Sequence, residues 1–335
     1  MRGCGKMSVK DNVLKILSDN KGIYFSGEDI AKELNVSRNS VWKAVKSLNN
    51  DGYAIKGISN KGYCLEEDND VVAKEIIEKY LDENIKDKID ITVYKTIDST
   101  NTRLKQLASE GACEWKVLIS EEQTAGKRRL NRTFYSPEKC GIYMSILLKP
   151  EFVSTEALFI TTMAAVAVAE AIESVVGVET KIKWVNDIYC NNKKVCGILT
   201  EAAMNLENGK LDYAVLGIGI NVKKPKEDYP DEIKEIATGI IDNEEKKYDD
   251  LRCKIAAQVI NNVKKYYMNL QEHKFMDKYK EKSLLVGRYV YIRDDENREE
   301  LLVKGIDDNA GLIVEHKDGR TDILSSGEVS VKLMN

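Results

Sequence analysis

The chain is poor in histidine, in proline and in closely spaced cysteines. Its 335 residues include 2 histidines and 4 prolines, and its 7 cysteines are scattered without a Cys-x-x-Cys pair. An odd number of unclustered cysteines argues against a disulfide framework, and the shortage of histidine argues against a zinc site. No positively charged start leads into an apolar segment, so the sequence shows no sign of a secretory signal.

Long apolar runs are missing as well. The longest, residues 157–169, is interrupted by Thr161 and Thr162 and is followed by Glu170 and Glu173. A membrane-spanning helix needs about 20 mostly apolar residues. We therefore expect no membrane partner and a cytoplasmic location.

The composition is that of a globular protein, with 43% hydrophobic and 32% charged residues and enough chain for two or three domains. The charge is distributed unevenly. Residues 1–65 hold 11 Lys+Arg against 6 Asp+Glu, whereas the rest of the chain holds 40 against 49. A basic N-terminal module on an acidic body favours a DNA-binding head, although a solvated basic face would give the same count.

The first 65 residues predict three helices and a hairpin. Apolar residues follow helical spacing from Val9, Ser26 is placed to cap a second helix, and Ser37 opens a third. The last two helices and their short turn match a helix-turn-helix, and the alternating segment 53–65 predicts a β-wing. The expected buried stripe of the third helix is Val41, Ala44, Val45 and Leu48.

Long basic side chains on the third helix and the wing suit contacts with phosphates, and an amide or guanidinium near the helix start suits base edges. The candidate DNA-contacting residues are Ser26, Ser37, Arg38, Asn39, Ser40, Lys43, Lys46, Lys56 and Lys61. A three-helix module that binds protein is the alternative.

A helical segment with apolar Val72, Ile76, Ile77 and Tyr80 separates the basic zone from the acidic zone, as a linker would. Four short strand-like runs close the chain. The sequence therefore predicts a winged helix-turn-helix in 1–66, a connecting helix in 67–84, an α/β body with a mixed sheet in 85–282, and a small SH3-like β-barrel in 283–335.

The centre of the chain, residues 183–201, reads KWVNDIYCNNKKVCGILTE. Two β-prone runs, 182–189 and 195–200, flank the polar link 191–194, which is the pattern of a hairpin with a tight turn. Lys194 stands where the second strand begins. One interpretation is a solvated turn lysine. The other is a positive charge that meets a carboxylate or phosphate of a ligand.

Three further segments carry side chains or glycines that could contact a ligand. Residues 98–101, Asp-Ser-Thr-Asn, precede a predicted helix and suit a cap, and their side chains also supply both donors and acceptors. Residues 122–134 hold four basic residues within six after Gly126, as in a solvated loop or an anion cradle. The Gly-Ile-Gly-Ile-Asn of residues 217–221 is a weak nucleotide fingerprint, because no helix follows it, but its glycines permit close approach of a ligand.

KWVNDIY followed by KKVCGIL resembles the central signature of the biotin protein ligases, whose bifunctional class also carries a repressor domain. The matches continue in order through DSTN, the basic loop, GIGIN and a tail with Gly327, Glu328 and Lys332, and SRNSVWKAVKSL resembles the recognition helix of the biotin-operon repressors. The chain departs from the family at Val185, where proline is common, and at Arg128 and Asn131, where glycine is expected.

The resemblance implies two half-reactions. The biotin carboxylate attacks the α-phosphate of ATP to give biotinyl-5′-AMP and pyrophosphate, and an acceptor lysine of a biotin carboxyl carrier protein then takes the biotin. It also implies Mg²⁺ held through the ATP phosphates rather than by protein ligands. On the regulatory side it implies operator DNA as a partner, the adenylate as corepressor, and a homodimer that forms when the adenylate binds.

The resemblance also assigns roles to residues. The catalytic candidates are Lys194 and Arg129. The biotin-binding candidates are Ser99, Thr100, Asn101, Gln123, Gly126, Lys127, Arg128, Arg129, Lys194, Gly197, Gly217 and Gly219. The ATP-binding candidates are Arg132, Phe134, Lys183, Asn186, Asp187, Asn221 and Lys332, with Phe134 expected to stack on adenine.

Two other functions fit parts of this pattern. A winged-helix regulator could sense biotin without efficient ligase activity, but the intact Lys183, Lys194 and Arg129 argue against it. A lipoate-type ligase would share the fold of the body, but the N-terminal head and the DSTN segment favour biotin.

Overall fold

The computed structural model describes residues 8–50, 52–66, 70–150, 157–204, 209–241, 249–292, 299–325 and 331–333. The chain divides into two compact units. One comprises Met1–Asp82 with Asn243–Ala257, and the other comprises Glu83–Asp242 with Gln258–Asn335. Each unit is described by itself.

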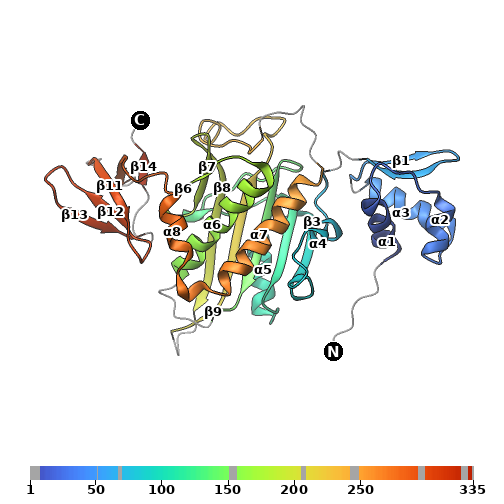
Figure 1. The fold of residues 1–335 in the computed structure, drawn as a ribbon, viewed down its shortest axis with the longest axis horizontal. Helices are drawn as coiled ribbons and strands as arrows, with labels where there is room; N and C mark the ends of the chain where they lie inside the picture. The colour runs from blue at the N-terminus through green and yellow to red at the C-terminus, as the bar shows by residue number, and fades with distance from the viewer. Residues whose placement is uncertain are drawn as a thin grey trace. The chain divides into compact units, whose positions relative to one another are not determined.

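The first unit contains the expected helix-turn-helix and wing (Figure 1). Helices α1 (Val9–Asp19), α2 (Gly27–Glu33) and α3 (Arg38–Asn50) pack on one another, and strands β1 (Ile55–Ile58) and β2 (Gly62–Leu65) pair antiparallel as the wing. Ser26 caps α2 by accepting a hydrogen bond from the backbone N–H of Asp29, as the sequence predicts. The predicted stripe of α3 is buried.

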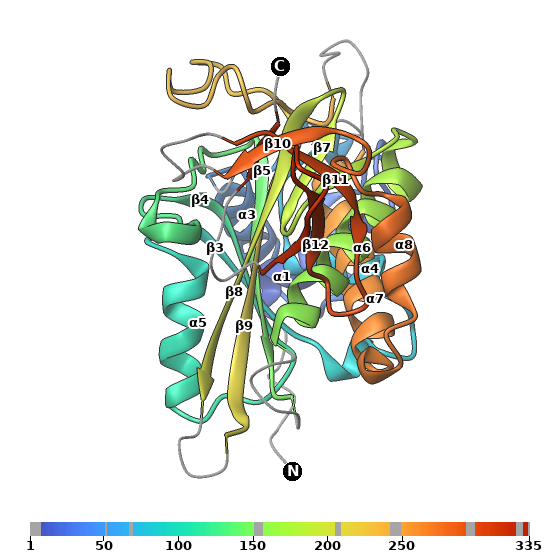
Figure 2. The ribbon, with the colours of Figure 1, turned by 90° about the vertical axis from the view of Figure 1, so that its left-hand side faces the viewer.

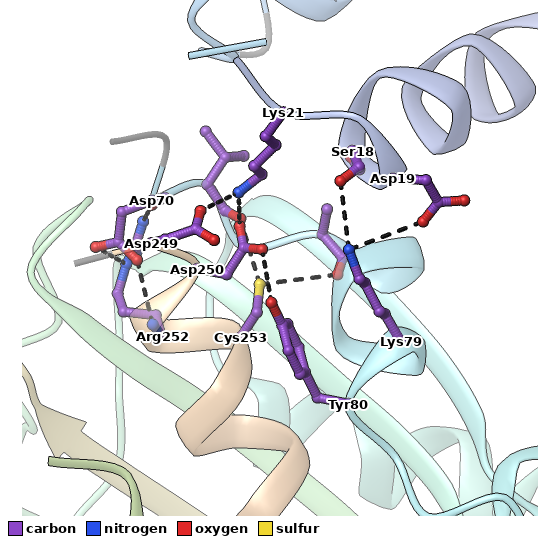
Figure 3. A network of polar contacts seen from close by, with 12 residues as sticks. Ser18, Asp19, Lys21, Asp70, Lys79, Tyr80, Asp249, Asp250, Arg252 and Cys253 are labelled. Carbon is purple, nitrogen blue, oxygen red and sulfur yellow. Dashed lines mark hydrogen bonds and ion pairs between the residues drawn. The ribbon is translucent and has the colours of Figure 1, made fainter. Parts of the chain in front are cut away.

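The connecting helix α4 (Lys74–Lys79) and the start of α7 (Leu251–Tyr267) complete this unit, and a polar network joins them to the end of α1 (Figure 3). Lys21 is only 10% exposed in its side chain and pairs with both Asp249 and Asp250. The hydroxyl of Tyr80 donates to Asp250 at 3.1 Å. Because Asp250 is almost fully buried, its charge depends on these partners.

A second part of the same network fixes Asp70, which lies just before the linker helix α4. The guanidinium of Arg252, 1% exposed, donates to Asp70 through Nε at 3.2 Å and also to the backbone carbonyl of Asp70. On the α4 side, Lys79 donates to the carbonyl of Ser18 at 3.3 Å. The winged helix, the linker helix and residues 249–253 are therefore tied by charge as well as by packing.

The second unit is built on a seven-stranded sheet in the order β3-β4-β5-β9-β8-β7-β6. Its strands are β3 (Asp90–Ile97), β4 (Lys116–Gln123), β5 (Gly141–Leu148), β6 (Lys181–Lys183), β7 (Asp187–Cys190), β8 (Lys193–Met204) and β9 (Leu211–Asn221). The β3–β4 pair is parallel and the other pairs are antiparallel, so the predicted mixed sheet is confirmed.

Helices cover both faces of this sheet (Figure 2). Helix α5 (Thr100–Ser109) lies on one face, where Leu104 and Ala108 pack against Leu118, Leu147 and Val215. Helices α6 (Ala157–Val176) and α8 (Phe275–Glu281) lie on the other, and short 3-10 turns occupy η1 (Lys86–Lys88), η2 (Arg129–Asn131) and η4 (Leu270–Glu272).

Helix α6 is the one helix among the described ranges that is long and apolar enough to span a bilayer. Its most apolar window is, however, 72% buried inside the fold. The side chains of Thr161 on α6 and Thr200 on β8 hydrogen-bond at 2.7 Å, which places α6 directly on the sheet. Its apolar character is therefore explained by core packing.

The C-terminal segment forms an antiparallel sheet in the order β13-β12-β11-β10-β14. Its strands are β10 (Tyr289–Ile292), β11 (Leu301–Ile306), β12 (Leu312–Glu315), β13 (Thr321–Leu324) and β14 (Val331–Leu333). The sequence predicts a small β domain here, and that is confirmed. It predicts only four strands, because the short β14 has little pattern of its own.

Two local predictions need correction. The run 182–189 is not one strand but β6 and β7 with a turn between them, because Trp184 donates to the carbonyl of Ala310 at 2.8 Å and Tyr279 donates to the carbonyl of Val185 at 2.9 Å. The sequence also predicts one helix over 249–273, but α7 ends at Tyr267 and is followed by η4. Ser154 and Thr155, which the sequence favours as helix caps, lie outside the described residues.

Candidate functional site

The site lies on the sheet face that carries α5. Register partners across β8, β9 and β5 form rows on this face, and the first row consists of Gly197, Gly219 and Tyr143. The next row is Leu199, Gly217 and Ser145. Since successive residues of a strand alternate between faces, all of these side-chain positions point the same way. Gly197, Gly217 and Gly219, which we call the glycine floor, leave this part of the face without side chains.

Large groups rest directly on the glycine floor. A Cβ added to Gly219 would lie 2.6 Å from the ring of Phe134, and one added to Gly217 would lie 2.2 Å from Oδ1 of Asn101. Both distances are shorter than real contacts of a Cβ atom. The two glycines are therefore required by close approach, as the sequence suggests, and a ligand would meet the same bare backbone.

The N-terminus of α5 brings a polar network to one end of the floor. Ser99 caps the helix by accepting from the backbone N–H of Thr102. The fully buried hydroxyl of Ser145 lies 2.5 Å from Oδ1 of Asn101 and 2.7 Å from Oγ1 of Thr100. One hydroxyl has one proton, so two acceptors share it and the cluster can accept another N–H or O–H donor.

Gln123, at the end of β4, extends this network toward the basic loop. Its Oε1 accepts from the backbone N–H of Thr100 at 2.8 Å and from the Thr100 hydroxyl at 3.1 Å. Its Nε2 donates to Ser136 at 3.1 Å. Gly126 is buried at this point, where an added Cβ would lie 2.6 Å from the carbonyl oxygen of Phe134.

Lys194 reaches the other end of the floor. Val195 is an extra residue on β8, because Tyr189 pairs with Lys194 while Ile188 pairs with Cys196. This bulge turns Lys194 onto the face of Gly197, where its Nζ lies 3.2 Å from an added Cβ. Its ammonium group pairs with Asp187 at 2.5 Å and its side chain is 13% exposed. The solvated-turn interpretation of Lys194 is therefore wrong.

The basic loop lies beside this lysine. Arg129 donates to Oδ1 of Asn186 at 3.3 Å, and Asn186 in turn donates to the carbonyl of Ile198 at 2.7 Å. Lys127 and Arg132 are exposed, and the backbone N–H of Arg128 donates to the carbonyl of Arg132. Arg128 stands where the family has glycine, but its backbone is extended, so no left-handed conformation is required of it. Leu130 takes the left-handed conformation instead, with φ of +60°.

The remaining ATP-binding candidates lie near the ends of their strands. Lys183 is the register partner of Asp187, and its Nζ lies 5.8 Å from the centre of the Tyr189 ring. Asn221 ends β9 opposite Gly141. The side chain of Lys332, together with residues Gly327 and Glu328, lies outside the described part of the chain.

The structure adds three polar residues that the sequence reasoning missed: Ser145, Lys105 and Glu201. Glu201 on β8 accepts from Asn101 at 2.9 Å and pairs with Lys105. Burial alone would raise the pKa of Glu201, but the hydrogen bonds from Lys105 and Asn101 and the nearby positive charges hold it below its ordinary value. A lone serine inside the apolar strand GIYMSILL was a usable signal, because a buried hydroxyl requires a partner.

The candidate DNA surface lies on α3 and the wing. Arg38, Asn39, Lys43 and Lys46 are exposed on α3, and Lys56 and Lys61 are exposed on the wing. Ser26 and Ser37 are occupied in local contacts, since Ser26 donates to Asp29 and Ser37 accepts from the backbone N–H of Ser40.

The same surface carries a large aromatic residue. Trp42 is 50% exposed, with Nζ of Lys46 5.2 Å from the centre of its ring.

The site can therefore do two things chemically. At one end of the floor, neutral donors and acceptors can recognise a polar, uncharged group of a ligand. At the other end, Lys194 and Arg129 can neutralise a carboxylate and a phosphate brought together. Among the described residues, no three His, Cys, Asp or Glu side chains are grouped as a metal site.

Known proteins resemble this chain along nearly its whole length. Residues 93–221 match the biotin/lipoate A/B protein ligase family, and residues 10–64 match an HTH domain. The bifunctional ligase/repressor BirA of Bacillus spizizenii is 31% identical over 324 residues, which cover 96% of this chain and 98% of that protein. The BirA of Bacillus subtilis is 30% identical over the same shares.

A solved structure shows the same fold over most of the chain. The biotin protein ligase from Aquifex aeolicus, in complex with biotin and ATP, aligns with a TM-score of 0.59 at 29% identity. The alignment covers 73% of this chain and 99% of that one. The fold and the similarity along nearly the whole length agree, and the chain belongs to the family of bifunctional biotin ligase/repressors.

Proposed function

We propose that the glycine floor and its two polar ends carry out both half-reactions of biotin transfer. A biotin carboxylate oxygen attacks the α-phosphorus of ATP, and the bond to pyrophosphate breaks. The amine of an acceptor lysine then attacks the acyl carbon of biotinyl-5′-AMP, and AMP leaves as the new amide forms. The observation that carries this proposal is the pairing of a neutral recognition network with two cations across one bare stretch of sheet.

The first step needs charge neutralisation more than a general base. Biotin's carboxyl group, with a pKa near that of glutamate at about 4.3, is already ionised at neutral pH and repels the phosphates. Lys194 and Arg129 are placed to reduce that repulsion. Lys194 now pairs with Asp187, so a bound anion would share or replace that carboxylate.

Biotin would lie over Gly197, Gly217 and Gly219, with its uncharged ring at Asn101 and Thr100 and its carboxylate toward Lys194. Ser99 would act mainly as the helix cap. The other biotin-binding candidates, Gln123 and Gly126 to Arg129, border this path. Arg132, Phe134, Lys183, Asn186, Asp187, Asn221 and Lys332 remain candidates for ATP.

Mg²⁺ would arrive with ATP. Mg²⁺ in nucleotide sites is usually bound through substrate phosphates and water with only one or two carboxylates, so we expect the ATP phosphates to hold it here. When bound, it would neutralise phosphate charge.

The direct test uses purified protein with biotin, α-labelled ATP and Mg²⁺. We expect labelled biotinyl-adenylate and pyrophosphate, followed by transfer to a biotin carboxyl carrier domain. Adenylate that forms with lipoate instead of biotin would support a lipoate-type ligase. Tight biotin binding with no adenylate would support a regulator without ligase activity.

For the regulatory half, we propose that the adenylate is the corepressor and that two heads bind operator DNA as a homodimer in the cytoplasm. A single winged helix offers few contacts, whereas two heads at a fixed spacing bind tightly. The adenylate can shift the monomer–dimer equilibrium only by its preference for the dimer, typically about 1–3 kcal/mol. The four domains are expected at 1–66, 67–84, 85–282 and 283–335.

Sedimentation and DNA binding test this half separately. We expect more dimer and higher operator affinity with biotin and ATP than without them. An Arg38→Ala, Lys43→Ala double variant should lose DNA binding and still make adenylate. If neither the dimer content nor the DNA affinity changes when biotin and ATP are added, the regulatory proposal is wrong.

A further inference from the structure

Asn101 stands at the centre of the recognition network, and the direction in which its amide points decides what the network offers. Its two ends are nearly equal in shape but opposite in hydrogen bonding. Oδ1 faces the Ser145 hydroxyl at 2.5 Å, while Nδ2 faces Glu201 at 2.9 Å. Reversing the amide would place an N–H group at Ser145 and an oxygen at a carboxylate.

Glu201 is the charged group that excludes the reversed orientation, and the carbonyl of Leu199, 3.5 Å from Nδ2, weakly favours the same one. An ionised carboxylate only accepts hydrogen bonds, so it requires the N–H end of Asn101. Lys105 lies one helical turn after Asn101 and pairs with the other oxygen of the same carboxylate. The pair is half-buried, with 31% and 26% of the two side chains exposed, so its charge is only partly screened.

We propose that Glu201, held by Lys105, is a positioning residue that fixes the Asn101 amide and so makes this end of the site select ligands that present N–H donors. With Oδ1 turned toward Ser145 above Gly217, Asn101, Ser145 and Thr100 together hold more acceptors than protons. A cyclic urea supplies the missing donors, whereas a ring without N–H groups leaves the buried acceptors unpaired. This inference rests on the proposed biotin site and adds the residues that set its selectivity.

Glu201→Gln is the discriminating variant, because glutamine keeps the size of the side chain but can both donate and accept. The reversed orientation of Asn101 then loses its charge penalty, and only the long 3.5 Å contact of Nδ2 with the carbonyl of Leu199 still opposes it. We expect the KM for biotin to rise about tenfold, with kcat at saturating biotin and the KM for ATP within about twofold of the wild type. The preference for biotin over an analogue lacking the ring N–H groups should shrink by a similar factor.

The double variant Asn101→Asp, Glu201→Gln provides a rescue. Glutamine at 201 donates to the new carboxylate at 101, whose other oxygen again accepts from Ser145. The polarity is restored with the amide and the carboxylate exchanged. We expect the double variant to recover most of the biotin KM, which a purely structural defect would not do.

Glu170→Gln is the matched control. Glu170 on α6 also pairs with a lysine, Lys278, and also accepts from a neutral group, the hydroxyl of Tyr266 at 2.7 Å. Its side chain has the same 26% exposure as that of Glu201, but it lies on the helix that covers the other face of the sheet. This variant should leave the biotin KM unchanged.

The outcomes separate the inference from the function on which it rests. If the wild-type protein makes no biotinyl-adenylate, the proposed function itself fails. If the wild type is active but Glu201→Gln matches Glu170→Gln in biotin KM, the positioning role is wrong. It is also wrong if the double variant is as impaired as Glu201→Gln while thermal unfolding shows all three variants folded.

Discussion

Gly217→Ala tests the glycine floor with a single methyl group. The added Cβ would lie 2.2 Å from Oδ1 of Asn101 and 2.8 Å from its Cγ, so the amide must retreat by about 0.8 Å to reach even 3.0 Å. That movement separates Asn101 from the Ser145 hydroxyl and from Glu201. Overpacking of this kind costs about 1–3 kcal/mol, and a hydrogen bond to a charged group contributes about 1.5–3 kcal/mol.

The expected result is a KM for biotin at least tenfold above that of the wild type, since each tenfold corresponds to about 1.4 kcal/mol. Initial rates of adenylate formation over a biotin titration measure it. Thermal unfolding should show a midpoint lower by a few degrees.

Two other glycines calibrate this result. Gly305→Ala on β11 adds a Cβ whose nearest neighbour is Cδ1 of Ile313 at 3.9 Å, which is an ordinary contact, so both readouts should stay at wild-type values. Gly197→Ala adds a Cβ at 3.2 Å from Nζ of Lys194 and 3.3 Å from the ring of Phe134, which is tight but not overlapping, and should fall between the two. A Gly217→Ala protein with the biotin KM and unfolding midpoint of the Gly305→Ala protein would refute the reasoning.

The remaining predictions concern three charged groups. Lys194→Ala should keep the fold and lower adenylate formation about a hundredfold, measured with labelled ATP; near-normal turnover would remove it from the reaction. Lys21→Ala leaves the buried Asp250 without its cation and should lower the unfolding free energy of the first unit by about 3 kcal/mol in denaturant unfolding. Lys32→Ala, which removes an exposed pair with Glu28, should leave that free energy unchanged. Hydrogen bonds to Glu299 and Asp322 raise the pKa of His316. The stabilisation by protonated His316 is therefore complete below the pKa of an unfolded histidine, about 6.5, and is lost as pH rises through the folded pKa. The difference in unfolding free energy between the wild type and His316→Gln should therefore become smaller as pH rises. A difference that grows with pH would contradict that assignment.

Much of this protein could be predicted from its sequence. Caps such as Ser26, the buried stripe of α3 and the tight turn at Asn191 and Asn192 are local, since they depend on residues within one turn or hairpin. The order of the motifs along the chain was enough to indicate the family, because each motif is short and contiguous.

Only the tertiary structure decided which of these residues meet. Lys194 joins the glycine floor because a bulge at Val195 shifts it to that face, and no periodicity shows a one-residue bulge. The break between β6 and β7 depends on Trp184 finding the carbonyl of Ala310, 126 residues away. Glu201 reaches Asn101 across 100 residues of sequence. The residue types were visible from the start, but the contacts that orient them form only when distant strands come into register.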